Sequence, residues 1–503
     1  MPLSSAVALL QAAVMLITLV QHTPNLPLAL RNEATAIAQE AITVARAQLT
    51  ATSSPVSSPV VIPASTGGGY TAPSTTTVVP TTTTAPTSTG SILPPTPAPV
   101  SPASPTTNPP VTVTTPQDTY LSQVLGLTSG LTRGNWSSAL FIESYNQGLT
   151  QQKYSYAPAV VRIGSIDHVF TCANAQSGVF RDEIDYTQRD AVTGKSLTGT
   201  VPALTASTLG SNLWDQQHIC DPSVIALKTH YQGQDFSYAM FYTATAKGAS
   251  EYNQIGIALA KDISGPWVKY PYPLVYYPGV PMLADNQHVD MSKESATGAW
   301  GVGEPTATAV NDHEFLLAYD VGDQNGTRVE VRNITITDLD TSGPQASDPR
   351  VLSLSNGDAT LGGPLMNLDM AYDPTSQQML LLTDRFYTIP SKPAPTFISD
   401  AIQIGSIPGG NMWGTSPAQW KQIGLLDLQN DGSSAQFRRH FTGGIVRNIY
   451  GGLPNASQLE MYWASSCTVE SLSGVQNACP AGLTRPEFTY EIWKSTLPIS
   501  LGQ

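Results

Sequence analysis

Residues 220–225 read Cys-Asp-Pro-Ser-Val-Ile, followed by Phe-Ser-Tyr-Ala-Met-Phe-Tyr-Thr at 236–243, Ile-Gly-Ile-Ala-Leu-Ala at 255–260 and Gly-Pro-Trp at 265–267. The first three runs are rich in β-branched and aromatic residues and are separated by polar or Gly-containing breaks. This pattern predicts three consecutive antiparallel strands. Pro222 donates no backbone hydrogen bond, so it favours a strand start. Asp221 is therefore predicted at the mouth of a sheet, where a chemically active side chain fits better than a core residue.

Four further runs resemble the strand that begins at Asp221. They are Ala157-Pro-Ala-Val-Val161, Gly303-Glu-Pro-Thr-Ala307, Asn367-Leu-Asp-Met-Ala-Tyr-Asp373 and His440-Phe-Thr-Gly-Gly-Ile-Val446. Successive runs lie 64 to 83 residues apart. Known propeller blades take about 40–50 residues, so these units would be blades with sizeable loops. The recurrence predicts an all-β fold, a five-bladed β-propeller over residues 118–503, with a β-sandwich as the alternative.

This arrangement resembles the five-bladed propeller glycosidases, namely glycoside hydrolase family 43 and its relatives in families 32, 68 and 130, which include the fructan-acting enzymes. The resemblance rests on the Asp-Pro-Ser-Val, Tyr-x-Met-Phe-Tyr-Thr, Ile-Gly-Ile-Ala and Gly-Pro-Trp runs of residues 221–267. In a propeller the first strand of each blade lines a central funnel. The starts of the five first strands are then expected to converge there, at Ala157, Asp221, Glu304, Asp369 and Gly443.

Glycoside hydrolysis needs two carboxyl groups, an acid with a raised pKa and a base or nucleophile. The resemblance implies that Asp221 is the second-blade acid, which tunes and orients, and that Glu304 is the third-blade general acid. Ala157 departs from the pattern, because the family's first-blade base would be an Asp there. The candidates to replace this base are Asp182 and Asp369, with Asp285 and Asp290 as weaker ones, and the sequence does not choose among them.

Aromatic and histidine side chains could contact a sugar in the same funnel. The candidates are Trp214, His218, Tyr242, Trp300, Trp413 and His440. The resemblance implies a channel role for His440, which in some family members helps to hold an ion or a water. Each candidate has a structural alternative, since most Trp, Tyr and lone His residues pack in a core or at its rim. Asp221 could likewise be a turn residue, Glu304-Pro305 is less distinctive alone, and Asp182 could be a surface or loop acid.

Composition limits the class of partner. Charged residues make up 12 % of the 503 residues, and the net charge is −13. This balance argues against nucleic acid or anionic lipid, which require clustered Lys and Arg, and is compatible with a neutral polysaccharide or oligosaccharide. No His/Cys spacing indicates a zinc site. We predict a monomer without a cofactor, and a structural calcium ion in the channel remains open.

The four cysteines are Cys172, Cys220, Cys467 and Cys479. A small, even number in a chain with exported features predicts two disulfides. Cys467 with Cys479 would close a short loop, and Cys172 with Cys220 would tie neighbouring blades. The alternative is four buried free thiols.

The first 117 residues differ from the rest of the chain. Residues 1–50 contain an apolar run at 6–20, which is short for a membrane span, and then a helical repeat. They could be a signal, an anchor or a helical hairpin. Residues 51–117 are rich in Thr, Ser and Pro without charge and predict a disordered linker. We therefore expect an extracellular or cell-surface protein, with attachment through the N-terminus as one option.

Three functions fit these observations. The first is an exported glycoside hydrolase, supported by Asp221 with Glu304. The second is a carbohydrate-binding propeller that has lost catalysis, which would account for Ala157. The third is an adhesion or scaffold module without an acidic funnel. A third carboxylate within about 5–9.5 Å of the other two would separate the first from the second.

Overall fold

The computed structural model describes residues 129–145, 148, 154–248, 251–293, 300–323, 326–354, 361, 365–386, 398–413, 420–427, 430, 439–467, 479, 482–483 and 485–501. Across these residues the chain is built of strands, with two short 3-10 helices, η1 (Gly409–Trp413) and η2 (Pro486–Phe488), and no α-helix. The all-β prediction is thus confirmed there. The predicted segments 1–50 and 51–117 lie outside the described residues. In the described part, no helix has the length and apolar character needed to cross a membrane.

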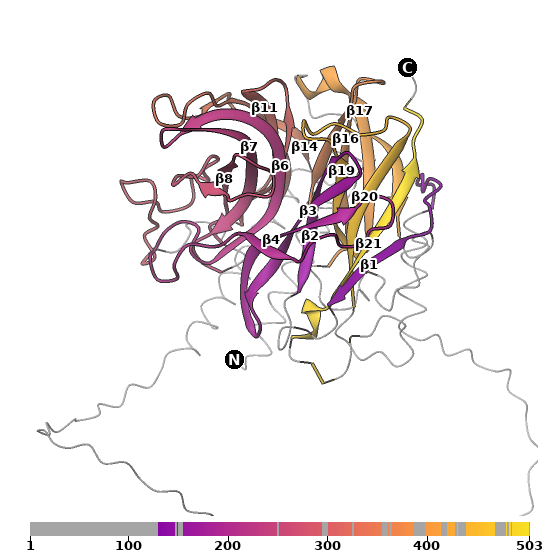
Figure 1. Cartoon of the computed structure of the whole chain (residues 1–503), viewed down its shortest axis with the longest axis horizontal. Coiled ribbons are helices and arrows are strands. Elements are labelled where there is room, and N and C mark those ends of the chain that lie inside the picture. The colour runs from indigo at the N-terminus through magenta and orange to yellow at the C-terminus, as the bar shows by residue number, and fades with distance from the viewer. Residues whose placement is uncertain are drawn as a thin grey trace, which may run out of the picture. The chain divides into compact units, whose positions relative to one another are not determined.

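The strands form four sheets, one of which has eight strands. A parallel ladder divides the eight-stranded sheet into two antiparallel halves, so we describe five antiparallel groups (Figure 1). Group 1 holds β2 (Ser155–Ile163), β3 (Ile166–Gln176), β4 (Val179–Asp190) and β5 (Val201–Leu204); group 2 holds β6 (His218–Tyr231), β7 (Gln234–Thr245), β8 (Gln254–Ala260) and β9 (Val268–Lys269); group 3 holds β10 (Gly301–Ala309), β11 (Glu314–Asp323), β12 (Gly326–Thr335), β13 (Gln345–Ala346) and β14 (Arg350–Leu354); group 4 holds β15 (Asp369–Asp373), β16 (Gln378–Arg385), β17 (Ala401–Pro408) and β18 (Lys421–Leu426); and group 5 holds β19 (Arg439–Arg447), β20 (Gln458–Ser466), β21 (Tyr490–Pro498) and β1 (Leu140–Tyr145).

The first strands of the groups follow one another in a closed ring. Each first strand contacts the next: β2 contacts β6, β6 contacts β10, β10 contacts β15, and β15 contacts β19. The ring closes where β19 contacts β2. At this last step the two strands form a parallel ladder, with Val446 opposite Val160 and Arg447 opposite Val161. Group 5 takes its outer strand, β1, from the start of the described chain, so segments far apart in sequence complete one sheet (Figure 1).

One residue at the start of each first strand has a left-handed backbone. These residues are Ala157, Asp221, Glu304, Asn367 and Thr442, with φ between 47° and 53°. Four of them lie at bulges in the ladder to the next strand, and Asn367 lies two residues before β15. A bulge redirects the side chain that it carries. We call all five residues with this backbone the bulge residues. They line one small cavity of about 30 Å³, which has room for a water or two.

Side chains accept the backbone N–H groups of all five bulge residues. Asp221 donates to Cys172 Sγ (2.9 Å), Glu304 to Thr243 Oγ1 (2.6 Å) and Thr442 to Asp384 Oδ1 (2.9 Å). Asn367 donates to Glu304 Oε2, and Ala157 to Thr442 Oγ1. The acceptor belongs to the preceding group each time, so these bonds link neighbouring groups around the ring.

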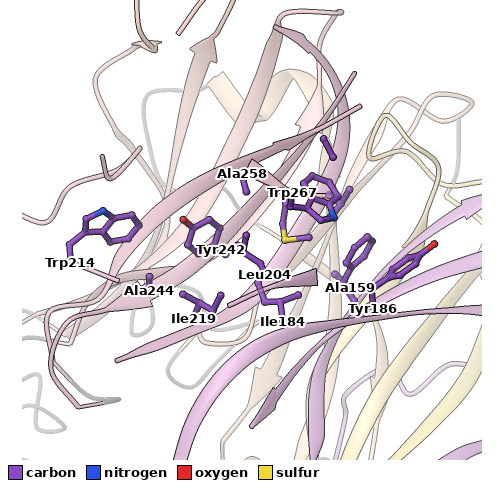
Figure 2. Packing of buried hydrophobic residues seen from close by; sticks show 14 of the residues in the cluster. Ala159, Ile184, Tyr186, Leu204, Trp214, Ile219, Tyr242, Ala244, Ala258 and Trp267 are labelled. Atoms are coloured by element: carbon purple, nitrogen blue, oxygen red, sulfur yellow. The ribbon is translucent and has the colours of Figure 1, made fainter. Parts of the chain in front are cut away.

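The core lies in layers between neighbouring groups, as group 2 illustrates. Trp214 and Tyr242 are buried and stacked, with ring centroids 6.1 Å apart (Figure 2). Gly256, on the next strand, faces both rings, because a Cβ there would lie 2.4 Å from Tyr242 and 2.7 Å from Trp214. The predicted strands 236–243 and 255–260 therefore bring Tyr242 and Gly256 together, and the absence of a side chain at Gly256 leaves room for the stacked Trp214 and Tyr242 rings.

Arg447 fills the ring beyond the bulge residues. Its side chain is fully buried and forms an ion pair with Asp369 at 3.2 Å. It donates to Ser223 Oγ, to Thr306 Oγ1 and to the carbonyls of Ala307 and Met370. Arg447 therefore bridges β6, β10, β15 and its own β19, and it supplies the positive charge beside Asp369.

Both predicted disulfides are present. Cys172 in β3 is bonded to Cys220 in β6, which ties group 1 to group 2. Cys467 is bonded to Cys479 in the segment after β20. The alternative of free thiols is excluded, because no cysteine is unpaired.

Candidate active site

A pocket of about 420 Å³ opens over the bulge residues. Its wall combines three carboxyl groups with a band of aromatic side chains. The lining residues are Tyr156, Phe180, Asp182, His218, Cys220, Asp221, Thr243, Ala244, Thr245, Asn253, Trp300, Glu304, Met366, Asn367, Phe441, Thr442, Arg485, Phe488 and Tyr490. A volume of this order is typical of small-ligand sites. The pocket therefore has the size and the chemical groups needed to hold part of a sugar chain.

Asp221 lies on the pocket floor beside the Cys172–Cys220 disulfide. Its Oδ1 is 3.2 Å from Cys220 Sγ, and the Thr243 hydroxyl reaches the same carboxyl group. Burial raises the pKa of Asp221 well above its usual range, and the neighbouring charges of Glu304 and Asp182 raise it further. Asp221 is therefore a candidate proton donor near neutral pH.

Glu304 lies next to Asp221 and is buried, with 6 % of its surface exposed. Burial raises its pKa, while hydrogen bonds from Asp320 and from the Asn367 N–H oppose this effect. Asp320, on the neighbouring strand β11 opposite Gly303, is 2 % exposed. Its own pKa is raised strongly by burial, by its hydrogen bond to Glu304 and by nearby acids. Glu304 and Asp320 thus form a buried pair that favours holding one proton.

Asp182 supplies the third carboxyl group of the pocket. It projects from β4 and accepts hydrogen bonds from the hydroxyls of Tyr154 and Tyr156, the latter at 2.8 Å. Burial raises the pKa of Asp182 to about 7, although the two tyrosine hydrogen bonds oppose the rise. The His218 ring accepts the Asp182 backbone N–H, and burial lowers the pKa of His218 to about 4, which keeps the ring neutral.

The aromatic wall faces these acids. Phe180 packs on His218, with centroids 4.5 Å apart, and on Phe488 at 4.9 Å. Trp300 is partly exposed on another side of the pocket. Arg485, half exposed, lies over the Phe488 ring and pairs with Glu487. Phe180 and Trp300 are partly exposed and offer apolar surface to the pocket, whereas Phe488 and His218 are each 5 % exposed.

The structure brings together some of the predicted site residues and separates others. Asp221, Glu304, Asp182, His218 and Trp300 share the pocket. Trp214 and Tyr242, expected as sugar platforms, are instead stacked in the core with 2 % and 0 % of their surfaces exposed, so neither ring faces the pocket.

The remaining candidates lie elsewhere. His440 is fully buried with its ring against Trp463, at a centroid distance of 4.8 Å. Asp369 lines the small cavity of the ring and is paired with Arg447, outside the wider pocket. Asp285 binds His288 at 2.6 Å on an exposed loop, and Asp290 binds Lys293 at 3.2 Å. The side chain of Trp413 lies outside the described residues.

Sequence reasoning missed three polar residues around Glu304. Asp320 and Asp384 lie on second strands, and Asn367 is the fourth bulge residue; its Nδ2 donates to Asp384 Oδ2 at 2.8 Å. Burial raises the pKa of Asp384 strongly. A signal was available, because Asp320 interrupts an apolar strand run and Asp384 follows one, and a buried acid requires a partner.

One cluster has the composition of a metal site. Among the described residues, Cys172, Cys220 and Asp221 hold their possible ligand atoms within 4.8 Å of one another. Both sulfurs are joined in the disulfide, so neither is the thiolate that binds metals. This cluster is better explained as the setting of the Asp221 carboxyl group.

No profile of a known protein family matches the sequence, and no curated protein does. Solved structures do resemble the fold. An α-L-arabinofuranosidase from Podospora anserina in complex with cellotriose is 12% identical, with 74% of this chain and 100% of that chain covered and a TM-score of 0.43. The catalytic domain of a family 62 α-L-arabinofuranosidase from Coprinopsis cinerea is 13% identical, with 73% and 97% covered and a TM-score of 0.43. A family 117 glycoside hydrolase from Zobellia galactanivorans is 10% identical, with 73% and 92% covered and a TM-score of 0.42.

Proposed function

We propose that this protein hydrolyses a glycosidic bond in an oligosaccharide or polysaccharide. The observation that carries the proposal is the convergence of Asp221, Glu304 and Asp182 in one aromatic-lined pocket, all with raised pKa values. Glycoside hydrolysis requires at least one carboxyl group that keeps its proton near neutral pH and one that is ionised. Burial and mutual repulsion among these acids create that difference.

The five strand groups supply the setting for this chemistry. We propose that they are the blades of a five-bladed propeller, with the bulge residues at the funnel floor. The closed order of first strands and the shared cavity of the bulge residues support this arrangement. Group 1 carries no acid at Ala157, but Asp182 reaches the same pocket from β4 of that group.

The cellular setting follows from the sequence and the disulfides. We propose an exported protein, extracellular or on the cell surface, that acts as a monomer on a carbohydrate. Two disulfides are typical of an oxidising compartment. The net charge of −13 and the buried acids of the pocket make nucleic acid an unsuitable ligand.

A carbohydrate-binding protein without catalysis is the second candidate. Ala157 favours it, because the first bulge residue carries no acid although it has the same backbone as Asp221 and Glu304. Such a protein would use the aromatic wall and the polar floor for binding alone.

Sugar release separates these functions. The full chain is incubated with a broad panel of oligosaccharides and polysaccharides, beside Asp221→Asn, Glu304→Gln and Asp182→Asn. We expect release by the wild type and a loss of at least about 100-fold in the first two variants. Asp285→Asn, on the exposed loop, is the matched control and should retain full activity. Glycan binding without release by the wild type would favour the binding protein, and release that survives the substitutions would place the site elsewhere.

A further inference from the structure

Asp221 and Glu304 share the pocket floor but have different hydrogen-bond partners. On one side Asp221 faces the disulfide, with Oδ1 3.2 Å from Cys220 Sγ and 3.8 Å from Cys172 Sγ. A disulfide carries no proton, so these sulfurs donate nothing to a carboxylate. The Thr243 hydroxyl is left as a side-chain donor to Asp221. These surroundings stabilise the neutral carboxylic acid over its anion.

Glu304 has the opposite surroundings. Its Oε2 accepts the backbone N–H of Asn367, and the neighbouring Asp320 carboxyl group, like this N–H, lowers the pKa of Glu304 against the effect of burial. Among the described residues no N–H or O–H reaches either carboxyl oxygen of Asp320. A buried pair of carboxyl groups in contact holds one proton, because two anions at that distance repel strongly.

The proton of this pair belongs on Asp320. Asp320 is the more buried of the two, with 2 % of its surface exposed against 6 % for Glu304. Glu304 also has the Asn367 N–H to stabilise an anion, whereas no N–H donates to the Asp320 carboxyl group among the described residues. A protonated Asp320 donates its O–H to Glu304, which then receives two hydrogen bonds as a carboxylate.

We propose that Asp221 is the general acid of this enzyme and that Glu304 acts as the ionised carboxylate, held in place by Asp320. This inference rests on the proposed function and deepens it. It reverses the roles that the family resemblance implies, in which Glu304 is the general acid. The reversal also accounts for Ala157, because the acid and the ionised carboxylate are then both supplied by groups 2 and 3.

The chemical step follows from these roles. Asp221 transfers its proton to the glycosidic oxygen while the bond between that oxygen and the anomeric carbon breaks, and the leaving sugar departs as an alcohol. Glu304 completes the step, either by attacking the anomeric carbon or by taking a proton from the water that attacks it. In both routes one water is consumed, and Asp221 regains a proton before the next cycle.

Other titratable groups face this pair from the surrounding strands. Asp182 and Tyr156 approach Asp221 from group 1, and Asp384 approaches Glu304 from group 4. Arg485 lies at the exposed rim, where its charge is screened by water and paired with Glu487. The acids around Asp221 disfavour a further negative charge on it, which supports the role of proton donor.

Leaving-group dependence tests the assignment. The substrates are an oligosaccharide cleaved in the panel and the 2,4-dinitrophenyl glycoside of the sugar that is released, whose leaving group needs no proton. We expect Asp221→Asn to lose at least about 100-fold in kcat/KM on the oligosaccharide but less than about 10-fold on the dinitrophenyl glycoside. Glu304→Gln should lose at least about 100-fold on both.

The contrary outcomes are distinct. If Glu304→Gln keeps its kcat/KM on the dinitrophenyl glycoside and Asp221→Asn loses it, the roles are those that the family resemblance implies. The assignment is then overturned, while the hydrolase function stands. Equal losses on both substrates for Asp221→Asn would also overturn it. Absence of release by the wild type from every substrate would instead refute the proposed function. Thermal unfolding of each variant confirms that it is folded, and Asp320→Asn, which keeps a donor toward Glu304, should retain far more activity than Asp320→Leu.

Discussion

Individual acids in this pocket carry a cost in stability. Asp182 is 3 % exposed, and its pKa rises from 3.8 to about 7 because burial penalises the charge. Between these values the unfolded chain releases the proton and the folded chain keeps it. The free energy of unfolding therefore falls as pH rises through this window, by at most about 4 kcal/mol for this residue alone.

We therefore predict that Asp182→Asn raises the melting temperature at pH 8 more than at pH 5. Asn keeps the shape and can still pair with the Tyr154 and Tyr156 hydroxyls, yet it has no charge to bury. Scanning calorimetry of the wild type and the variant at both pH values measures the difference. Asp285→Asn is the control, because hydrogen bonds hold the pKa of Asp285 at about 2 and it stays ionised throughout. An equal shift at pH 5 and pH 8 for Asp182→Asn would contradict the assignment of a buried, protonated acid.

At the scale of strands, the position of a bulge residue could be predicted from the sequence where a proline follows it. Pro158, Pro222 and Pro305 directly follow the first three bulge residues, and there the predicted positions and the structure agree. The fourth and fifth first strands have Leu368 and Gly443 in place of proline. The acid of the fourth run then suggested Asp369, whereas the bulge residue is Asn367, two residues earlier.

The second strands were harder to read, because their role depends on contacts between groups. Cys172, Thr243 and Asp384 share little chemistry, yet each accepts the N–H of the next bulge residue. Asp320 lies at the matching register position of β11, but Glu304 accepts the Asn367 N–H itself. In group 3 the acceptor is thus the bulge residue Glu304 and not the second-strand residue Asp320. This exchange depends on how the groups meet in the ring, so no local sequence pattern predicts it.

Of the two disulfides, we predict that one affects the pocket and the other affects stability alone. Removing Cys172–Cys220 with paired alanines should cost about 4 kcal/mol in the chain-entropy account for its separation of 48 residues, and Cys467–Cys479 about 3 kcal/mol for 12. The first change also removes the acceptor of the Asp221 N–H. We expect sugar release, or glycan binding, to fall about 10-fold or more with the first pair and to stay unchanged with the second.

Urea unfolding measures the stability of both double variants, and the sugar assay measures the pocket. The two readouts are independent, since the assay is run at urea-free conditions where both variants are folded. The same loss of activity in both variants would show that the disulfide beside Asp221 acts through stability only.

At the scale of the whole molecule, different kinds of interaction connect neighbouring first strands around the ring. At three of these connections a side chain accepts a backbone N–H of the next first strand. Ser223 accepts the N–H of Ala307, Thr306 that of Met370, and Asp369 that of Ile445. The matching positions on β2 and β19 are Ala159 and Gly444, which have no acceptor. The disulfide joins groups 1 and 2, and the parallel ladder of β19 with β2 closes the ring.

Gly444 makes that last connection possible by its lack of a side chain. A Cβ at this position would lie 1.7 Å from the carbonyl oxygen of Pro158 and 2.8 Å from its carbon, and both atoms are backbone of β2. The two strands approach so closely that no side chain fits without moving one of them. Because Arg447 follows on the same strand and bridges four of the first strands, such a shift would spread through the ring.

We therefore predict that Gly444→Ala destabilises the protein by about 1–3 kcal/mol or more, the range expected when a substitution forces backbone to move in a packed interior. Gly410→Ala is the matched control, since a Cβ at Gly410 meets nothing within 4 Å and the change should stay within about 0.5 kcal/mol. Urea unfolding of the two variants beside the wild type gives both values. Equal stability of Gly444→Ala and Gly410→Ala would mean that the first and last groups are not held together at this point, and the closed ring that places Asp221 and Glu304 side by side would need another explanation.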